Sequence, residues 1–250
     1  MIMITQQILI IGANSNIAKA IAAQIKTDKS KGLILISRSL PNAISEDNKI
    51  TNTNVTQINI KDYQSQSIEQ AIKSMELLHQ VSITQVFICN GILHNENIHP
   101  EKRLEDFDAT AFQEVLTTNA LTPMLWIQKL TPMLTGKTPC KLVVFSARVG
   151  SISDNRLGGW YSYRASKAAL NMMLKTTAVE LARRAKNIKI IAFHPGTTDT
   201  PLSKPFQKNV PVNKLFTCEF VAARVLIIAE KTECDGKASY LDWQGKTIDW

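Results

Sequence analysis

Several features that would mark other classes of protein are missing from this sequence. Its 250 residues contain no apolar run close to the roughly 18 residues that a membrane span requires, so we expect no membrane partner. The first residues have neither a positive region nor an apolar core, so we expect no secretory signal peptide. The four cysteines form no CxxC pair and no metal-binding spacing. This favours free thiols, a cytoplasmic location and no bound metal.

The formal net charge of +8 lacks the pattern of a nucleic-acid-binding protein. Such a protein presents a continuous basic stripe with aromatic residues or a recognition motif, and we find neither. The one local concentration of cations consists of Arg183, Arg184, Lys186 and Lys189. It is better explained as a solvated helix end, where positive charge is favourable. We therefore expect no nucleic-acid partner, although the positive excess would attract an anionic cofactor.

Short apolar runs alternate with helical periodicity along the whole chain. The runs that predict strands are Ile8–Ile11, Leu33–Ile36, Val55–Ile60, Val86–Cys89, Lys141–Phe145, Ile188–Phe193 and Ser239–Asp242. Helical periodicity occupies residues 17–25, 68–78, 107–130, 163–185 and 219–229. Strands that are apolar on both faces and alternate with helices predict a parallel sheet covered on both sides. No linker or internal repeat divides the chain, so we predict one α/β domain over residues 1–250.

In such a sheet ligands bind beyond the carboxyl ends of the strands, so the residues that directly follow each strand are informative. After the first strand, Gly12 permits a tight turn, and the next helix can hold a pyrophosphate at its N-terminus. An ordinary turn capped by Asn14 or Ser15 would look the same. After the second strand, Ser37 and Arg38 replace the acidic residue that would hold a ribose 2′-hydroxyl. They suit a 2′-phosphate, which favours NADP(H) over NAD(H), unless Arg38 is simply a surface residue.

A tyrosine and a lysine four residues apart, Tyr163 and Lys167, open a long helical stretch. They share one helix face, one turn apart. An ammonium group there stabilises the phenolate, so we expect Lys167 to lower the phenol pKa from its reference value of about 10. The phenol then becomes a usable proton donor or acceptor. Taken alone, the pair is better explained by a half-buried aromatic residue beside a solvated lysine.

The order and spacing of the motifs resemble the short-chain dehydrogenase/reductase family over essentially the whole chain. The resemblance rests on Gly12, Asn90-Gly91, Asn119, Ser146, Tyr163-x-x-x-Lys167 and Pro195-Gly196-x-x-x-Thr200. Residues 150–171, residues 241–246 and the terminal Trp250 are similar to the branch of sniffer-type carbonyl reductases and C-factor-like signalling proteins. The resemblance implies a Rossmann-like, doubly wound, seven-stranded parallel sheet in a three-layer α/β/α sandwich. It also implies a homodimer or homotetramer.

The family implies roles for the matching positions. Tyr163 would protonate the carbonyl oxygen of the substrate. Lys167 would lower the pKa of Tyr163 and bind the nicotinamide ribose. Asn119 would hold a water in the proton relay, while Thr198 and Thr200 would contact the nicotinamide amide and a phosphate. The other positions implied to bind the cofactor are Gly12, Asn14, Ser15, Asn16, Ile17, Ser37, Arg38, Asn59, Ile60, Asn90, Gly91, Pro195 and Gly196.

The substrate serine departs from the family pattern, because Ala147 stands where that serine is expected. Ser146 is adjacent and lies at a strand end, where geometry is fixed, so we favour it as the catalytic serine. Ser151 is the competing candidate. We expect Ser151 and Trp160 to contact the substrate.

The resulting prediction is an NADPH-dependent oxidoreductase that reduces an aldehyde or ketone to an alcohol. Phe206 and Phe216 favour an apolar substrate body, although such residues also anchor ordinary lids. The alternative is a C-factor-like signalling or interaction protein with weak or no catalysis. It is motivated by Asn16 and Ala18, which replace two glycines of the expected glycine-rich turn, and it predicts weak dinucleotide binding.

Overall fold

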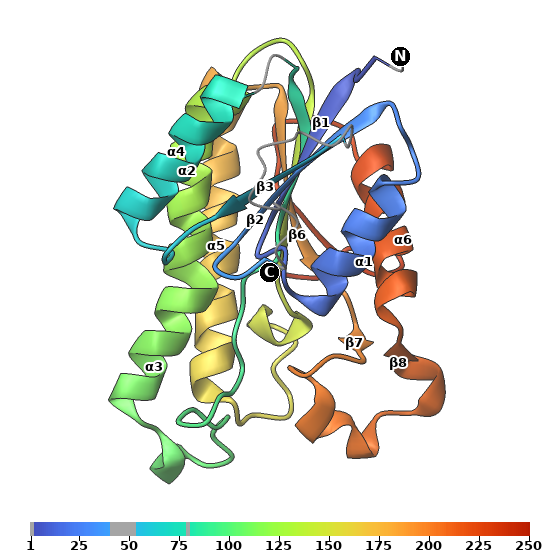
Figure 1. Ribbon diagram of the computed structural model, residues 1–250. Coiled ribbons are helices and arrows are strands. Elements are labelled where there is room, and N and C mark those ends of the chain that lie inside the picture. Colours follow the sequence, from blue (N-terminus) through green and yellow to red (C-terminus); the bar gives the residue numbers. More distant parts are fainter. Residues whose placement is uncertain (1–2, 41–53, 79–80) are drawn as a thin grey trace.

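The computed structural model describes residues 3–40, 54–78 and 81–250 (Figure 1). Its main strands are β1 (Gln6–Ile11), β2 (Lys31–Ser37), β3 (Val55–Asn59), β4 (Ile83–Ile88), β5 (Cys140–Phe145), β6 (Ile188–His194) and β9 (Ser239–Asp242). They form one parallel sheet in the order β3-β2-β1-β4-β5-β6-β9. The predicted seven-stranded, doubly wound parallel sheet is therefore confirmed.

Helices cover both faces of the sheet, as Figure 1 shows. One face carries α1 (Asn16–Ile25) and α6 (Cys218–Lys231), and the other carries α2 (Ser65–Leu78), α4 (Thr122–Leu134) and α5 (Tyr161–Arg184). The predicted three-layer sandwich is thus confirmed. In the part of the chain that the structure describes, no helix is both long and apolar enough to cross a membrane.

The strands are apolar on both faces because each face packs against a helical layer. Along β1, Leu9 and Ile11 point into the core under α2, α4 and α5. Ile8 and Ile10 point into the second core, under α1 and α6. The strand predicted over Val86–Cys89 is observed over Ile83–Ile88. The prediction missed its first residues because polar Thr84 and Gln85 interrupt the apolar signal.

The long helix predicted over residues 107–130 is three consecutive segments. Asp108 caps α3 (Ala109–Leu116) by accepting a hydrogen bond from the Ala111 amide, and α3 leads into a π-helical turn, η2 (Thr117–Leu121). The chain then continues as α4. Single π turns inside α-helices frequently mark functional sites. This one places Asn119 in the interior, fully buried.

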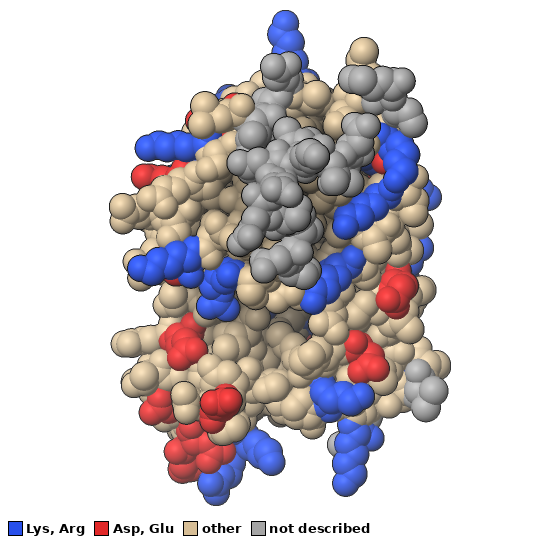
Figure 2. Space-filling model, viewed as in Figure 1, with Lys and Arg blue, Asp and Glu red and all other residues tan. Residues whose placement is uncertain are grey.

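The carboxyl ends of the parallel strands meet at one edge, so the segments after β1, β4, β5 and β6 come together there. The segment after β6 contains a two-stranded parallel ladder of β7 (Thr197–Thr198) and β8 (Leu215–Phe216). Short helical turns border the same edge: η1 (Leu104–Asp106), η3 (Arg148–Gly150), η4 (Lys204–Asn209) and η5 (Val212–Lys214). Figure 2 shows a hollow in the middle of the viewed face, with Lys and Arg side chains on both sides.

Candidate active site

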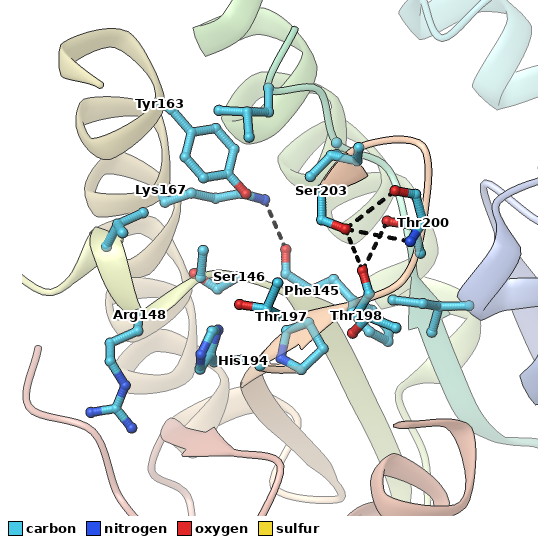
Figure 3. Close-up of a pocket in the computed structure, with 18 of the residues that line it drawn as sticks. Phe145, Ser146, Arg148, Tyr163, Lys167, His194, Thr197, Thr198, Thr200 and Ser203 are labelled. Carbon is cyan, nitrogen blue, oxygen red and sulfur yellow. Dashed lines mark hydrogen bonds between the residues drawn. The ribbon is translucent and has the colours of Figure 1, made fainter. Parts of the chain in front are cut away.

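A cavity of about 580 Å³ opens at the carboxyl edge of the sheet (Figure 3). It brings together thirteen of the predicted site residues: Ser15, Asn16, Ile17, Asn90, Gly91, Ser146, Trp160, Tyr163, Lys167, Pro195, Gly196, Thr198 and Thr200. The other predicted residues, which do not line it, are Gly12, Asn14, Ser37, Arg38, Asn59, Ile60, Asn119 and Ser151. Loops from four different strands and the helix α5 therefore converge on one space.

Tyr163 and Lys167 lie side by side in this cavity, one turn apart on α5 (Figure 3). The Lys167 side chain is buried, and its Nζ donates a hydrogen bond to the carbonyl oxygen of Phe145 at 2.9 Å. The same Nζ lies 5.8 Å from the centroid of the Tyr163 ring. The end of β5 thus fixes the lysine, and the lysine lies beside the tyrosine.

The electrostatics of the pair differ from the prediction. Burial raises the pKa of Tyr163 above its ordinary value, and burial lowers the pKa of Lys167 to about 8. The expectation that the phenol pKa falls below its reference value is therefore wrong for this structure. Desolvation of the phenolate is the largest cause of this shift, and the Lys167 ammonium directs its hydrogen bond to Phe145. At neutral pH the phenol is protonated and the lysine is mainly charged.

The serine after β5 faces the helix α5. The Ser146 hydroxyl is buried and donates to Asn171 Oδ1 at 2.7 Å, although the residue lines the cavity. Ser151 is also buried, and its hydroxyl accepts from the Asp154 amide and contacts Ser153, outside the cavity lining. The geometry thus favours Ser146 over Ser151, because only Ser146 of the two lines the cavity.

Asn119 joins three parts of the site. Its Oδ1 accepts from the Ile92 amide at 2.7 Å, and its Nδ2 donates to the Ile92 carbonyl at 2.8 Å and to Ser166 Oγ at 3.0 Å. The side chain therefore ties the π turn to the loop after β4 and to α5. Both amide donors are used in these contacts, and the predicted relay water stays a prediction.

The turn after β1 has the geometry of a close backbone approach. Gly12 has a φ of +74°, and a side-chain carbon added there would lie 3.1 Å from the Asn90 backbone nitrogen. Ser15 caps α1 by accepting from the Ala18 amide at 3.3 Å. Asn14 donates to the Ser39 hydroxyl at 3.1 Å, which joins the turn to the end of β2. The start of α1 therefore faces the cavity with its N-terminal amides available for an anion.

At the far end of the site, Arg38 follows β2 and is exposed. Its guanidinium lies 5.3 Å from the centre of the Tyr63 ring. Asn59 accepts a hydrogen bond from the Leu40 amide at 3.2 Å, and the Ile60 amide donates to the Ser37 carbonyl at 3.1 Å. These residues shape the sheet edge beside β2 and β3 rather than the cavity itself.

Three buried polar atoms of the cavity lining have no hydrogen-bond partner within the described chain: Asn90 Oδ1, Thr198 Oγ1 and His194 Nδ1. Such atoms are rare in folded proteins and call for a ligand or water. Burial and the nearby Arg148 lower the pKa of His194 to about 4, so its ring is neutral at pH 7. The cavity is therefore equipped with amide, hydroxyl and imidazole groups that a polar ligand such as a dinucleotide would satisfy.

The opposite wall of the cavity is aromatic. The Trp160 ring lies edge-on to Tyr163 at 6.1 Å and to Phe206 at 5.0 Å between ring centroids. Phe206 in turn lies edge-on to His94 at 5.6 Å. Leu93, Val149, Leu202 and Val210 complete an apolar lining at this end. No group of residues that could hold a metal ion is present in the described parts of the chain.

Periodicity could not identify several residues that shape the site. Asn171, Ser166 and Glu101 act through side-chain contacts between segments distant in sequence. Gly150, Ser166 and Asn171 lie within the run of residues 150–171 that is similar to the family branch, whereas Glu101 carried no such signal. A side-chain carbon at this glycine would lie 2.7 Å from Lys167 Cβ, so the turn after β5 packs directly on α5.

Comparison with known proteins gives a consistent result. A family model described as short chain dehydrogenase matches residues 6–211. The C-signal of Myxococcus xanthus is 26% identical over 147 residues, which cover 59% of this chain and 83% of that protein. Carbonyl reductase Sniffer of D. melanogaster superposes with a TM-score of 0.82 at 18% identity, over 98% of this chain and 100% of that one. The NADPH-bound carbonyl reductase from chicken fatty liver superposes with a TM-score of 0.79 at 21% identity, over 99% of this chain and 95% of that one.

Proposed function

Because the chain belongs to the short chain dehydrogenase family, we propose that it is an NADPH-dependent carbonyl reductase that converts an aldehyde or ketone into an alcohol. The observation that carries this proposal is the meeting of Tyr163 and Lys167 in a cavity lined by three unpartnered polar atoms. The family is one of oxidoreductases, and the site supplies both a proton donor and polar groups that fit a nicotinamide cofactor.

A bound NADPH would supply the hydride. Asn90, Thr198 and the first amides of α1 would hold it, because these polar groups face the cavity without another use. Tyr163 keeps its proton because burial raises its pKa, so its hydroxyl can donate that proton to a carbonyl oxygen as negative charge develops there. Lys167, mainly charged at pH 7, stabilises the phenolate that remains and would bind ribose hydroxyls.

The preference for NADPH is supported by Arg38, which stands where an acidic residue would favour NADH. Arg38 is exposed and its guanidinium lies over the Tyr63 ring, while the next residue, Ser39, accepts a hydrogen bond from Asn14 in the turn after β1. A planar guanidinium is well suited to hydrogen-bond a phosphate. NADPH is also the dinucleotide in the chicken carbonyl reductase.

The substrate wall supports a carbonyl compound with an apolar body. Trp160 and Phe206 present aromatic surface next to Tyr163, and Leu202 lies beside them. Aromatic and aliphatic walls bind apolar ligands by removing their surface from water, and edge-on ring contacts favour aromatic groups. We expect aryl or branched ketones to be better substrates than small polar aldehydes.

The test is NADPH oxidation over a panel of aldehydes and ketones with wild type, Tyr163→Phe and Tyr161→Phe. Loss of a positioned general acid should lower the rate of the first variant by roughly 100- to 10,000-fold. Tyr161 begins the same helix but is exposed, so the second variant should keep wild-type rates. Equal rates for Tyr163→Phe and wild type would refute the catalytic assignment.

The similarity to C-signal favours a second candidate, a signalling protein on the same fold. This candidate predicts weak dinucleotide binding, whereas the reductase predicts tight binding. Trp160 lines the cavity, so its fluorescence should change when NADPH is titrated into the protein. Absence of any NADPH-dependent change, together with no turnover, would favour the signalling role.

A further inference from the structure

The turn that leads into α5 has an unusual backbone. Gly158, Gly159 and Trp160 all have positive φ, at 64°, 64° and 53°. Trp160 is the one non-glycine residue with positive φ in the parts of the chain that the structure describes. Such a conformation costs a bulky residue roughly 1–3 kcal/mol, and it persists only where its surroundings hold it. The strained residue is also the one whose ring faces Tyr163 and Phe206.

Two residues hold the backbone of this turn, Glu101, which is distant in sequence, and Arg164 on α5. The Trp160 amide donates to the Glu101 carbonyl oxygen at 2.5 Å. A side-chain carbon at Gly159 would lie 3.3 Å from that same oxygen. Arg164 donates from its side chain to the carbonyls of Gly159 at 2.9 Å and Gly158 at 3.1 Å. The backbone of the turn is thus pinned from both sides.

The Glu101 carboxylate continues the same attachment into the helix. Both of its oxygens accept from the Ser162 amide at 3.2 Å, and the Ser162 hydroxyl donates to Oε1. The helix α5 has no acidic residue in its first turn and no side-chain cap of its own. Glu101 therefore supplies, from the loop before α3, the negative charge that a helix N-terminus favours.

The carboxylate is buried, with 4% of the residue exposed. No Lys, Arg or His of the described chain forms an ion pair with it. A buried charge is costly unless donors surround it. Here the donors are Ser162 and the start of α5, so the carboxylate and the first turn of α5 stabilise each other. Moving that turn would leave the charge without partners.

We propose that Glu101 is a positioning residue that fixes the start of α5, and through it the placement of the Trp160 indole and the Tyr163 hydroxyl. Glu101 touches neither cofactor nor substrate by this account, and the inference rests on the proposed reductase function. Tyr163 directly follows Ser162, so a change in the first turn of α5 moves the proton donor. Trp160 lies just before this turn, so the same change moves the aromatic wall of the cavity.

The test compares Glu101→Ala and Glu101→Gln with Glu105→Ala, an exposed glutamate of the same loop that serves as the matched control. Displacement of a reacting group by about 1 Å can cost roughly 100-fold in rate. We therefore expect Glu101→Ala to lower kcat by roughly 10- to 100-fold. NADPH affinity, set mainly by the segments after β1, β4 and β6, should be unchanged. Glu101→Gln retains an oxygen acceptor and should recover most of the rate, while Glu105→Ala should match wild type.

Two results would overturn the proposal. One is an unchanged kcat in Glu101→Ala. The other is a fall in kcat matched by equal losses of NADPH affinity and thermal stability, which would indicate a general structural role. If the wild-type protein reduces no carbonyl compound, the proposed function fails. The position of the first turn of α5 is then tested by two measurements that do not require catalysis. Acrylamide quenching of the tryptophan fluorescence that Trp160→Phe removes, and amide exchange at Ser162, should then both increase in Glu101→Ala, and no increase would refute the inference.

Discussion

Gly150 offers a sharp test of how the site is held together, because its place leaves no room for a side chain. In Gly150→Ala the new Cβ would lie 2.7 Å from Lys167 Cβ, 2.8 Å from the Lys167 backbone carbon and 3.0 Å from Asn171 Nδ2. Ordinary contact begins at 3.4 Å, so the methyl group must move about 0.7 Å away from Lys167. Two of the three neighbours belong to the body of a helix and cannot rotate aside.

The expected cost follows from this overlap. Forcing extra volume into a packed interior typically costs about 1–3 kcal/mol of unfolding free energy. For a chain of this size, each kcal/mol lowers the melting temperature by roughly 2–4 °C. The displaced turn carries Ser146 at one end and contacts Lys167, so the rate of carbonyl reduction should also fall, by up to roughly 100-fold.

The matched control is Gly136→Ala. A side-chain carbon at Gly136 meets nothing within 4 Å, and its backbone is not in the left-handed region. Alanine there should leave stability unchanged or raise it by about 0.4–1 kcal/mol, through reduced freedom of the unfolded chain. Urea unfolding and NADPH oxidation are measured for both variants. Equal unfolding midpoints for the two would refute the argument that the turn after β5 packs on α5 without spare room.

Two further predictions concern the charged groups. Arg38→Ala should remove a charge-assisted contact of about 1.5–3 kcal/mol, and so lower kcat/KM for NADPH by roughly 10- to 100-fold while kcat/KM for NADH is unchanged. The control is Lys61→Ala, at an exposed lysine. Equal losses of kcat/KM with both dinucleotides would contradict the assignment. Activity should fall as the pH rises through about 8, where Lys167 loses its charge. Because this pKa lies below its value of 10.5 in the unfolded chain, Lys167 binds more protons in the unfolded state between about 8 and 10.5, so its own contribution to the unfolding free energy should rise with pH there, against the opposite contributions of buried Cys89, Cys140 and Tyr163, whose pKa values are raised. Lys167→Met should remove that rise, which pH-dependent urea unfolding would detect.

The sheet was predictable from sequence because its signal is local and repeated. Each strand is a short apolar run, and runs such as Ile8–Ile11 are apolar on both faces because two helical layers cover them. The ligand-binding edge followed from the parallel order alone, since all carboxyl ends meet there. The π turn at Thr117–Leu121 could not be predicted, because the apolar pattern continues through it. Only the buried contacts of Asn119 with Ile92 and Ser166 specify it.

Thirteen of the predicted site residues line one cavity, but the electrostatics of that cavity were not predictable. The spacing of Tyr163 and Lys167 placed both on one helix face, which the structure shows. The direction of the phenol pKa depends on how much water the fold removes from each group, and sequence spacing contains no such information. Glu101 was equally hidden, because its partner Ser162 is 61 positions away. Contacts and electrostatic effects between residues distant in sequence are therefore the features of the site that only the three-dimensional structure reveals.

The serine at the end of β5 shows where motif matching and geometry diverge. Ser146 and Ala147 are neighbours on an extended backbone, so their side chains point in opposite directions. A serine that precedes the family's position by one residue therefore faces α5, where Ser146 donates to Asn171 Oδ1. To donate to a substrate carbonyl, this hydroxyl would have to leave Asn171 or accept a shift of the turn that Gly150 packs against Lys167. In the proposed reductase the carbonyl oxygen would then be held mainly by Tyr163, which makes the placement of that phenol by the start of α5 more important here than in a site with two hydroxyl donors.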